Sequence, residues 1–397
     1  MEPGDDTQRT GAMRAVGAGP SRLRSLDGLR GVAAVIVLLH HAALLNASVS
    51  NVYLNPAAPL SPTAIVLTRT PLQLLTSGEE AVLVFFVLSG LVVALPAIRG
   101  PFDWLAYYPR RVLRIVLPVV ASVVLAAVLV LASLHPASQA TSSWSGNYSF
   151  DSLDWRQVVR TADLLLGDVA INNPLWSLRY EILFSILLPL YIVMARAWSR
   201  RVWIPIVGVV VVMIVGYLVQ DPNLQYLPIF LLGTVLAVRL DDVRIAVARW
   251  TAGRRAWIGV ATTIIALLAI DARWILRPIR PTSATLGEVG FVVSVFGAAA
   301  LVVVVASWGP AVRVFETRLV QWLGRISFSL YLVHAPILLA ASTWLHGLPW
   351  WAGGLLGIPI AVIVAALFCR FVEQPAHRLA RSVGRRLVQR DVGSPPQ

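Results

Sequence analysis

The chain has 397 residues, of which 57% are apolar and 13% are charged, and its mean hydropathy is +0.73. A soluble globular domain carries about 25% charged residues, so this composition excludes an ordinary soluble protein. The single cysteine, Cys369, excludes an internal disulfide framework and a zinc site built from several thiolates.

The formal net charge is +13, and all 33 basic residues are arginine. These arginines form short clusters between apolar runs instead of one continuous basic face. Such a distribution is typical of the loops between membrane spans, where positive charge stays on the cytoplasmic side. It argues against nucleic acid as a partner.

The two ends of the chain differ from its middle. Residues 1–20 are polar, rich in glycine and without an apolar core. We interpret them as a disordered cytoplasmic tail and not as a cleavable signal peptide. Residues 21–380 form the expected membrane domain, and residues 381–397 form a basic cytoplasmic tail.

Apolar runs recur along the whole membrane domain. Each is long enough to cross a hydrocarbon core of about 30 Å, which takes roughly 20 helical residues. The predicted fold class is therefore an all-α, polytopic bundle of transmembrane helices. We expect about ten spans, and eight if the weak sixth and seventh runs do not cross the bilayer. The runs lie near 27–47, 80–98, 113–134, 175–195, 202–219, 225–240, 257–272, 286–307, 326–345 and 353–372.

The arginines also predict the orientation. With the N-terminus placed in the cytoplasm, 26 arginines fall in inner segments and 7 fall outside or at outer span ends. Because cytoplasmic loops are enriched in arginine, this split predicts that both chain ends are cytoplasmic. The use of arginine alone as the basic residue, with many alanines and valines, indicates a GC-rich bacterium, so we expect the protein in a bacterial inner membrane.

The first span, SLDGLRGVAAVIVLLHHAALL, places ionisable groups where an ionised side chain costs about 2.5–3.5 kcal/mol. Arg30 and His41 are 11 residues apart. At about 100° per residue they share one helix face, about 16 Å apart along the axis. His40 points about 100° away from His41. Asp27, one turn before Arg30, is placed to neutralise it.

His41 is the candidate general base. Burial disfavours the charged imidazolium, so a histidine in a span is a neutral proton acceptor, and such a group can activate a hydroxyl. The alternative is a histidine that only hydrogen-bonds a neighbouring helix. We expect no metal site, because His334 is the only other histidine deep in a span and no acidic cluster accompanies it.

A second cluster, YYPRRVLR, precedes the third span. Arg110, Arg111 and Arg114 fall within about one helical turn and offer forked donors that match phosphate groups. The alternative is a plain topology signal or a contact with anionic lipids.

Two further segments carry polar groups into spans. NNPLWSLRYEILF opens the fourth span and holds Trp176, Ser177 and Glu181, which are candidates for orienting a base or an acceptor hydroxyl. The alternative there is an interfacial anchor in which Arg179 neutralises Glu181. GRISFSLYLVHAPILL in the ninth span holds Tyr331 and His334; its serines, Ser327 and Ser329, are explained by close helix packing.

Six segments together resemble the acyltransferase-3 family of integral membrane acyltransferases, which O-acylate sugars and natural products. They occur in the order and spacing of that family, from about residue 25 to residue 378. The segments are SLDGLRGVAAVIVLLHH, FFVLSGLVV, RRVLRI, LWSLRYEILF, GRISFSLYLVHAPI and VEQPAHRL.

The resemblance implies a ten-span core with cytoplasmic ends. It also implies transfer of an acyl group, usually acetyl from acetyl-CoA, to a hydroxyl. The family's Arg-X10-His motif falls on Arg30 and His41, and its Arg-Arg-X-X-Arg motif on the triplet 110, 111 and 114. Its Trp-Ser-Leu-X-X-Glu motif falls on Trp176, Ser177 and Glu181.

The chain departs from the family pattern in two places. Ile182 follows the motif glutamate, where many members have a second acidic residue. Val333 stands where many members carry an aromatic residue after their Tyr-Leu pair. Both departures bear on which acceptor fits.

The motifs and the resemblance combine into one hypothesis. Acyl-CoA binds through Arg30 and the arginine triplet, and no metal takes part. His41 is the base, with Arg30 and Glu181 as further catalytic residues. The residues expected to bind the acceptor are Trp176, Ser177, Tyr331 and His334.

Two other classes of function remain open at this stage. A proton-coupled secondary transporter or exporter also buries arginine, histidine and glutamate. A degenerate family member acting only as a scaffold is a third possibility, which the intact Arg30 and His41 motif argues against. The acceptor is a cell-envelope glycan, a lipid-linked sugar or a secreted natural product. The sequence leaves the acyl chain length and the oligomeric state open.

Overall fold

The computed structural model describes residues 23–55, 57–279 and 282–392, and this part of the chain is helical without any strand. The N-terminal tail predicted for residues 1–20 lies outside it. The basic tail predicted from residue 381 continues a helix as far as Val392. The all-α membrane bundle predicted from the sequence is confirmed.

Eight helices within the described residues are long and apolar enough to cross a membrane. One of these, α12, has only 15 residues by itself. It reaches the length of a span when the 3-10 turn Gly253–Arg255 before it is included. Another, α17, runs through a π-helical turn (Cys369–Glu373) into α18 (Gln374–Val392). The eight are α1 (Arg24–Ala43), α4 (Gly78–Arg99), α5 (Trp104–Ala132), α8 (Trp176–Ala197), α12 (Ala256–Ile270), α14 (Ala284–Ser307), α16 (Arg318–Trp344) and α17 (Trp350–Phe368).

The other two expected spans are also helical but differ from these eight. Helix α9 (Trp203–Val219) is apolar but has only 17 residues. Helix α11 (Ile229–Trp250) is long enough, but its second half carries five charged residues in the stretch RLDDVRIAVAR. The count of ten spans and the cytoplasmic placement of both ends therefore stay predictions.

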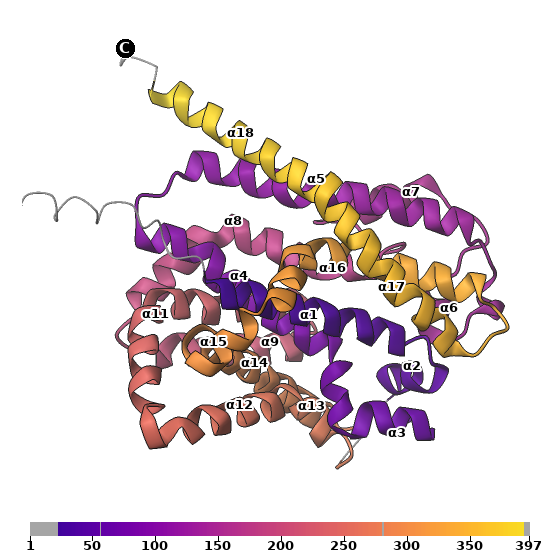
Figure 1. Cartoon of the computed structure of the whole chain (residues 1–397), viewed down its shortest axis with the longest axis horizontal. Coiled ribbons are helices and arrows are strands. Elements are labelled where there is room, and N and C mark those ends of the chain that lie inside the picture. Colours follow the sequence, from indigo (N-terminus) through magenta and orange to yellow (C-terminus); the bar gives the residue numbers. More distant parts are fainter. Residues whose placement is uncertain (1–22, 56, 280–281, 393–397) are drawn as a thin grey trace, which may run out of the picture.

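Several short helices, among them α2 (Ala47–Leu54) and α3 (Pro62–Arg69), lie at one end of the bundle. The first two, α2 and α3, begin where a side-chain oxygen of Asn46 or Ser61 accepts a hydrogen bond from the backbone of the first turn. We call this the short-helix end, at the right of Figure 1, and the opposite end, where α1, α5 and α16 begin, the arginine-rich end. The short α-helices within the described residues are α2 (Ala47–Leu54), α3 (Pro62–Arg69), α6 (Ser143–Gly146), α7 (Trp155–Ala162), α10 (Pro222–Tyr226), α13 (Ala272–Leu276) and α15 (Gly309–Phe315). Of these, α15 lies at the arginine-rich end, where Phe315 packs against Gly28 near the start of α1.

Helices α1 and α16 are parallel neighbours at the centre of the bundle, and α16 is the most buried of the eight spans. Their backbones touch where Gly31 meets Gly324: a Cβ atom added to Gly31 would lie 2.4 Å from the backbone nitrogen of Gly324. Small residues allow such close approach between helices in a membrane. This contact sets the register between the two helices.

Two apolar clusters flank this central pair. One is formed by α4, α8, α11 and α14, and includes Phe86, Phe184 and Phe230. The other is formed by α5, α16 and α17, and includes Ile115 and Leu330.

The glycine contact yields a stability prediction. Gly31→Ala places a methyl group against the backbone of α16, which cannot move aside as a side chain can. We expect a loss of about 1–3 kcal/mol, the usual penalty for overpacking, seen as a lower thermal midpoint of the protein in detergent.

The matched control is Gly208→Ala in α9, where an added Cβ has no atom within 4 Å. That variant should keep or slightly raise the midpoint, because alanine favours helices over glycine. Equal midpoints for the two variants would show that the α1–α16 contact is not tight.

Candidate functional site

A cavity of about 610 Å³ lies between the two apolar clusters. It opens at the arginine-rich end, where the α4–α5 connection contributes Pro101, Phe102 and Asp103, and its walls come from α1, α4, α5, α8 and α16. Its polar lining residues are Arg30, Ser89, Asp103, Tyr107, Arg110, Arg111, Arg114, Ser177, Glu181, Ser327 and Tyr331.

All four predicted donor-binding arginines line this cavity. Arg30 comes from the second turn of α1, and the triplet comes from the first turns of α5, where Asp103 caps the helix by accepting from the Ala106 backbone at 2.9 Å. Only two carboxylates, those of Asp103 and Glu181, share the lining with the four guanidinium groups. The cavity is therefore positively charged and suits a ligand with several phosphates.

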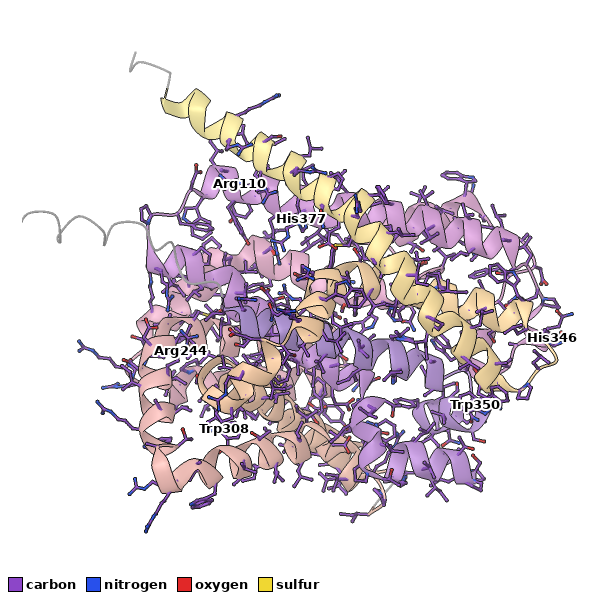
Figure 2. All side chains as sticks on the ribbon, viewed as in Figure 1. Arg110, Arg244, Trp308, His346, Trp350 and His377 are labelled. Atoms are coloured by element: carbon purple, nitrogen blue, oxygen red, sulfur yellow. The ribbon has the colours of Figure 1, made fainter. Side chains whose placement is uncertain are left out.

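Arg110 marks the rim of the cavity on the side of α18 (Figure 2). Its side chain packs against Gly384 of α18 so closely that a Cβ there would meet Nε of Arg110 at 2.0 Å. That Nε has no hydrogen-bond partner among the described residues. Arg110 is thus held between the cavity rim and α18.

Arg111 is held differently, because it pairs with Glu181 of α8. Its Nη2 donates to Oε1 of Glu181 at 2.6 Å, and its Nε donates to Oγ of Ser185 at 2.9 Å. The two charged side chains are only 12% and 22% exposed. This pair joins α5 to α8 across the cavity wall, and it places Glu181 on the arginine side of the site.

The cavity narrows at Tyr331 and Ser177, deep in the bundle. The Tyr331 hydroxyl lies 2.6 Å from Oγ of Ser177 and donates to the carbonyl oxygen of Pro174 at 3.0 Å. The Phe85 ring, 5.7 Å from the Tyr331 ring between centroids, forms the neighbouring wall. Behind Tyr331, at a centroid distance of 6.1 Å, lies the imidazole of His334.

His334 and His41 form a hydrogen-bonded pair on α16 and α1. Nε2 of His334 lies 3.1 Å from Nδ1 of His41, and both side chains are buried. Nδ1 of His334 faces the carbonyl oxygen of Leu330 at 2.9 Å, so it carries a hydrogen and its Nε2 is an acceptor.

The tautomer of His41 follows from the same geometry. Its Nδ1 faces two acceptors, Nε2 of His334 and the carbonyl oxygen of Val37 at 2.9 Å, so it carries the hydrogen. In the neutral ring the lone pair then sits on Nε2, which is the atom able to take a proton. His334 therefore orients His41 in the way that a carboxylate orients the histidine of a catalytic triad.

The two histidines lie at the same distance along their helices from the glycine contact between α1 and α16. His41 is ten residues beyond Gly31, and His334 is ten residues beyond Gly324. On parallel helices, ten residues correspond to about 15 Å on each, so the glycine contact also brings the imidazoles level. The repeated spacing was visible in the sequence, but it has meaning only once α1 and α16 are known to be parallel neighbours.

His40 belongs to a separate polar network at the short-helix end. Its Nδ1 donates to the carbonyl oxygen of Thr76 at 2.7 Å. Nearby, Oε1 of the buried Glu80 accepts from the Trp274 indole at 3.1 Å. Burial raises the pKa of Asp271 to about 6, although a hydrogen bond from Ser77 acts in the opposite direction. This network ties α1, α4 and α13 together without reaching the cavity lining.

The structure thus brings together most of the predicted site residues. The four arginines, Ser177, Glu181 and Tyr331 share the cavity, whereas His41, His334 and Trp176 do not line it. Trp176 packs instead against Tyr226 and Tyr180, with centroid distances of 5.2 and 6.0 Å.

Sequence reasoning missed one buried carboxylate near the cavity. Glu373 of the π-helical turn accepts from Oγ of Ser329 at 2.6 Å, so Ser329 has a polar partner beyond its packing role. The only signal was an acidic residue at the end of the last apolar run. No group of three or more histidine, cysteine or acidic side chains suited to a metal ion occurs within the described ranges.

A family model described as an acyltransferase domain, that of the acyltransferase-3 family, matches residues 23–370. The match begins just before α1 and ends in the π-helical turn after α17, so it includes the whole cavity lining and both histidines. No curated protein and no solved structure matches the chain.

The pairing of Arg111 with Glu181 is open to a double-mutant cycle. We expect Arg111→Ala and Glu181→Ala each to lower the thermal midpoint, because each leaves a half-buried charge without its partner. The double variant should lose less than the sum of the two, with a coupling of about 1–3 kcal/mol. Additive losses would show that the two side chains act independently.

Proposed function

The chain belongs to the acyltransferase-3 family and is a multi-pass membrane O-acyltransferase; from this premise we propose that it transfers an acetyl group from acetyl-CoA to a hydroxyl of a carbohydrate or a glycosylated natural product. The observation that carries the proposal is the cavity that leads from four arginines to Tyr331, whose ring lies 6.1 Å from the His334 ring between centroids.

The arginine-rich end of the cavity suits the phosphate groups of coenzyme A. Arg30, Arg110 and Arg114 project into the cavity as forked donors, while Arg111 is held by Glu181. We assign this end to the cytoplasm of a bacterial cell, in the inner membrane, where acetyl-CoA is made. Glu181 then acts on the donor side by fixing Arg111, and not by touching His41.

The pantetheine arm is long and mostly uncharged, and the deeper part of the cavity matches it. Near Ser177 and Tyr331 the lining includes the apolar side chains of Phe85 and Leu178. A donor seated in this way directs its thioester toward Ser177 and Tyr331. In our proposal the Tyr331 ring shifts to let the acetyl group reach His41.

Nε2 of His41 then serves as the general base. It takes the proton of the acceptor hydroxyl as that oxygen attacks the thioester carbonyl carbon. The carbon–sulfur bond breaks, and the departing thiolate of coenzyme A receives the proton from His41. The imidazolium formed between these steps is stabilised by its two acceptors, the Val37 carbonyl and Nε2 of His334.

We place the acceptor at the short-helix end, opposite the donor. His41 lies in the last turn of α1, so it is nearer to that end than any cavity arginine is. Ser177, Tyr331 and His334 remain our candidates for holding the acceptor near His41, whereas Trp176 packs against Tyr180 and Tyr226 instead. A proton-coupled transporter is the competing function: it would move an unmodified solute, whereas the proposed enzyme puts labelled acetyl from acetyl-CoA onto an acceptor.

The histidine pair gives the first functional prediction. His41→Ala should lower the rate of acetyl transfer by about 10²- to 10⁴-fold, the usual contribution of a general base. His334→Ala should lower it less, and His334→Gln should recover part of the loss, because the glutamine carbonyl can accept from Nδ1 of His41.

The rate is measured as labelled acetyl transferred from acetyl-CoA to the envelope fraction of membranes that contain each variant. The thermal midpoint in detergent serves as the control for folding. Wild-type turnover by His41→Ala would remove His41 from the mechanism, and equal losses in both His334 variants would remove the orienting hydrogen bond.

The arginines give the second functional prediction. Arg30→Ala and Arg114→Ala should each raise the KM for acetyl-CoA about tenfold to hundredfold, the range expected when a charge-assisted hydrogen bond is lost. Arg254→Ala, an exposed change in the turn before α12 and outside the cavity, is the matched control. Equal KM values in the cavity variants and the control would exclude this cavity as the donor site.

A further inference from the structure

The short helix α6 covers the end of α1 that carries His41. Its Trp144 is 7% exposed, and the indole ring lies 5.2 Å from the His41 imidazole between centroids, tilted by 47°. His334 contacts the same imidazole at 4.9 Å. The ring of the proposed base therefore contacts three other rings, those of His334 on α16, of Trp144 in the connection between α5 and α8, and of the adjacent His40.

Hydrogen bonds between neutral groups hold α6 in this position. The Trp144 backbone N–H donates to Oγ of Ser50 at 2.9 Å, and Ser143 donates to the side-chain oxygen of Asn51 at 2.8 Å. On the other side, the hydroxyl of Thr141 lies 3.1 Å from that of Ser342 on α16. The hydrogen-bonding groups around Trp144 thus carry no charge, which favours an uncharged ligand.

The indole N–H of Trp144 has no hydrogen-bond partner among the described residues. Buried tryptophans normally place this group against an acceptor. The same connection between α5 and α8 holds a second such atom: Oδ1 of Asn172 is also without a partner within the described part, although its amide donates to the Leu332 carbonyl on the turn of α16 before His334.

These two atoms are one donor and one acceptor, both buried and both contributed by the connection between α5 and α8. A hydroxyl group offers both functions, since it donates one hydrogen and accepts through its lone pairs. An aromatic ring beside them suits a ligand with an apolar face. A neutral ring that carries several hydroxyls, such as a sugar, meets all of these conditions.

We propose that Trp144 is a binding residue for the acceptor, with the indole ring packed against the face of a hydroxylated ring and Nε1–H donating to one of its oxygens. This inference rests on the proposed acetyl transfer at His41. In the absence of acceptor, the same side chain closes the short-helix end of the site and keeps water from the thioester.

Two variants separate the roles of the ring and of its N–H group. Trp144→Phe keeps an aromatic ring but loses the N–H, and Trp144→Ala removes both. The matched control is Trp155→Ala, a change in α7 of the same α5–α8 connection at a side chain that is 69% exposed. Membranes holding each variant receive labelled acetyl-CoA, and two products are measured, acetyl on the envelope fraction and free acetate.

We expect Trp144→Ala to lower acetyl transfer at least tenfold and to raise acetate release, because water reaches the thioester. Trp144→Phe should lower transfer about fivefold, the effect of one lost hydrogen bond, with acetate release unchanged. The KM for acetyl-CoA should not change in either variant. Trp155→Ala should match the wild type in both products.

Wild-type transfer by both Trp144 variants would overturn the inference, and so would a loss of transfer accompanied by a raised KM for acetyl-CoA. The proposed function is tested separately by His41→Ala in the same assay. If His41→Ala still transfers acetyl, or if the wild-type protein uses no acetyl-CoA, the proposed function fails. If His41→Ala is inactive and the Trp144 variants are normal, only the role of Trp144 fails.

Discussion

The contact between Gly31 and Gly324 determines much of what the bundle can do. It brings the backbones of α1 and α16 together without intervening side chains. Because the helices are parallel, their residues stay level beyond the contact, and ten residues on they present His41 and His334 to each other. A larger residue at either glycine separates the helices and lengthens that hydrogen bond. The reactive pair is thus positioned by packing that occurs elsewhere on the same two helices.

Charged side chains and neutral polar side chains also lie at different depths of the bundle. Guanidinium groups gather at one end of the cavity, where solvent and a phosphate ligand can stabilise them. The histidine pair lies deeper, and its hydrogen bonds are satisfied by neutral acceptors: the Val37 carbonyl, the Leu330 carbonyl and Nε2 of His334. This arrangement keeps the imidazoles neutral inside an apolar bundle and leaves Nε2 of His41 with a free lone pair. In the proposed mechanism, donor binding and proton transfer therefore occur in two different dielectric environments.

Much of this architecture was predictable from the sequence, because hydrophobic length alone identifies membrane helices. The all-α bundle and the acyltransferase family are confirmed, and each of the ten predicted runs contains a helix. The arginine cavity was also foreseeable, since Arg110, Arg111 and Arg114 lie within one short helical stretch. The side chains from other helices that contact these residues could not be predicted from the sequence. Nothing in the sequence says that α5 neighbours α8, so the Arg111–Glu181 pair appears only in the fold. The covering position of Trp144 depends in the same way on how a long connection folds back over α1.

In the proposed mechanism, the acetyl group must pass Tyr331, where the cavity ends, to reach His41. A structure of the protein with a non-hydrolysable acetyl-CoA analogue tests this most directly. We predict phosphates at Arg30, Arg110 and Arg114, a displaced Tyr331 ring, and the acyl carbon close enough to Nε2 of His41 for a hydroxyl to lie between them at hydrogen-bond distance, about 2.6–3.2 Å from that nitrogen. An acyl group that stops on the arginine side of an unmoved Tyr331, or phosphates bound away from these arginines, would contradict it.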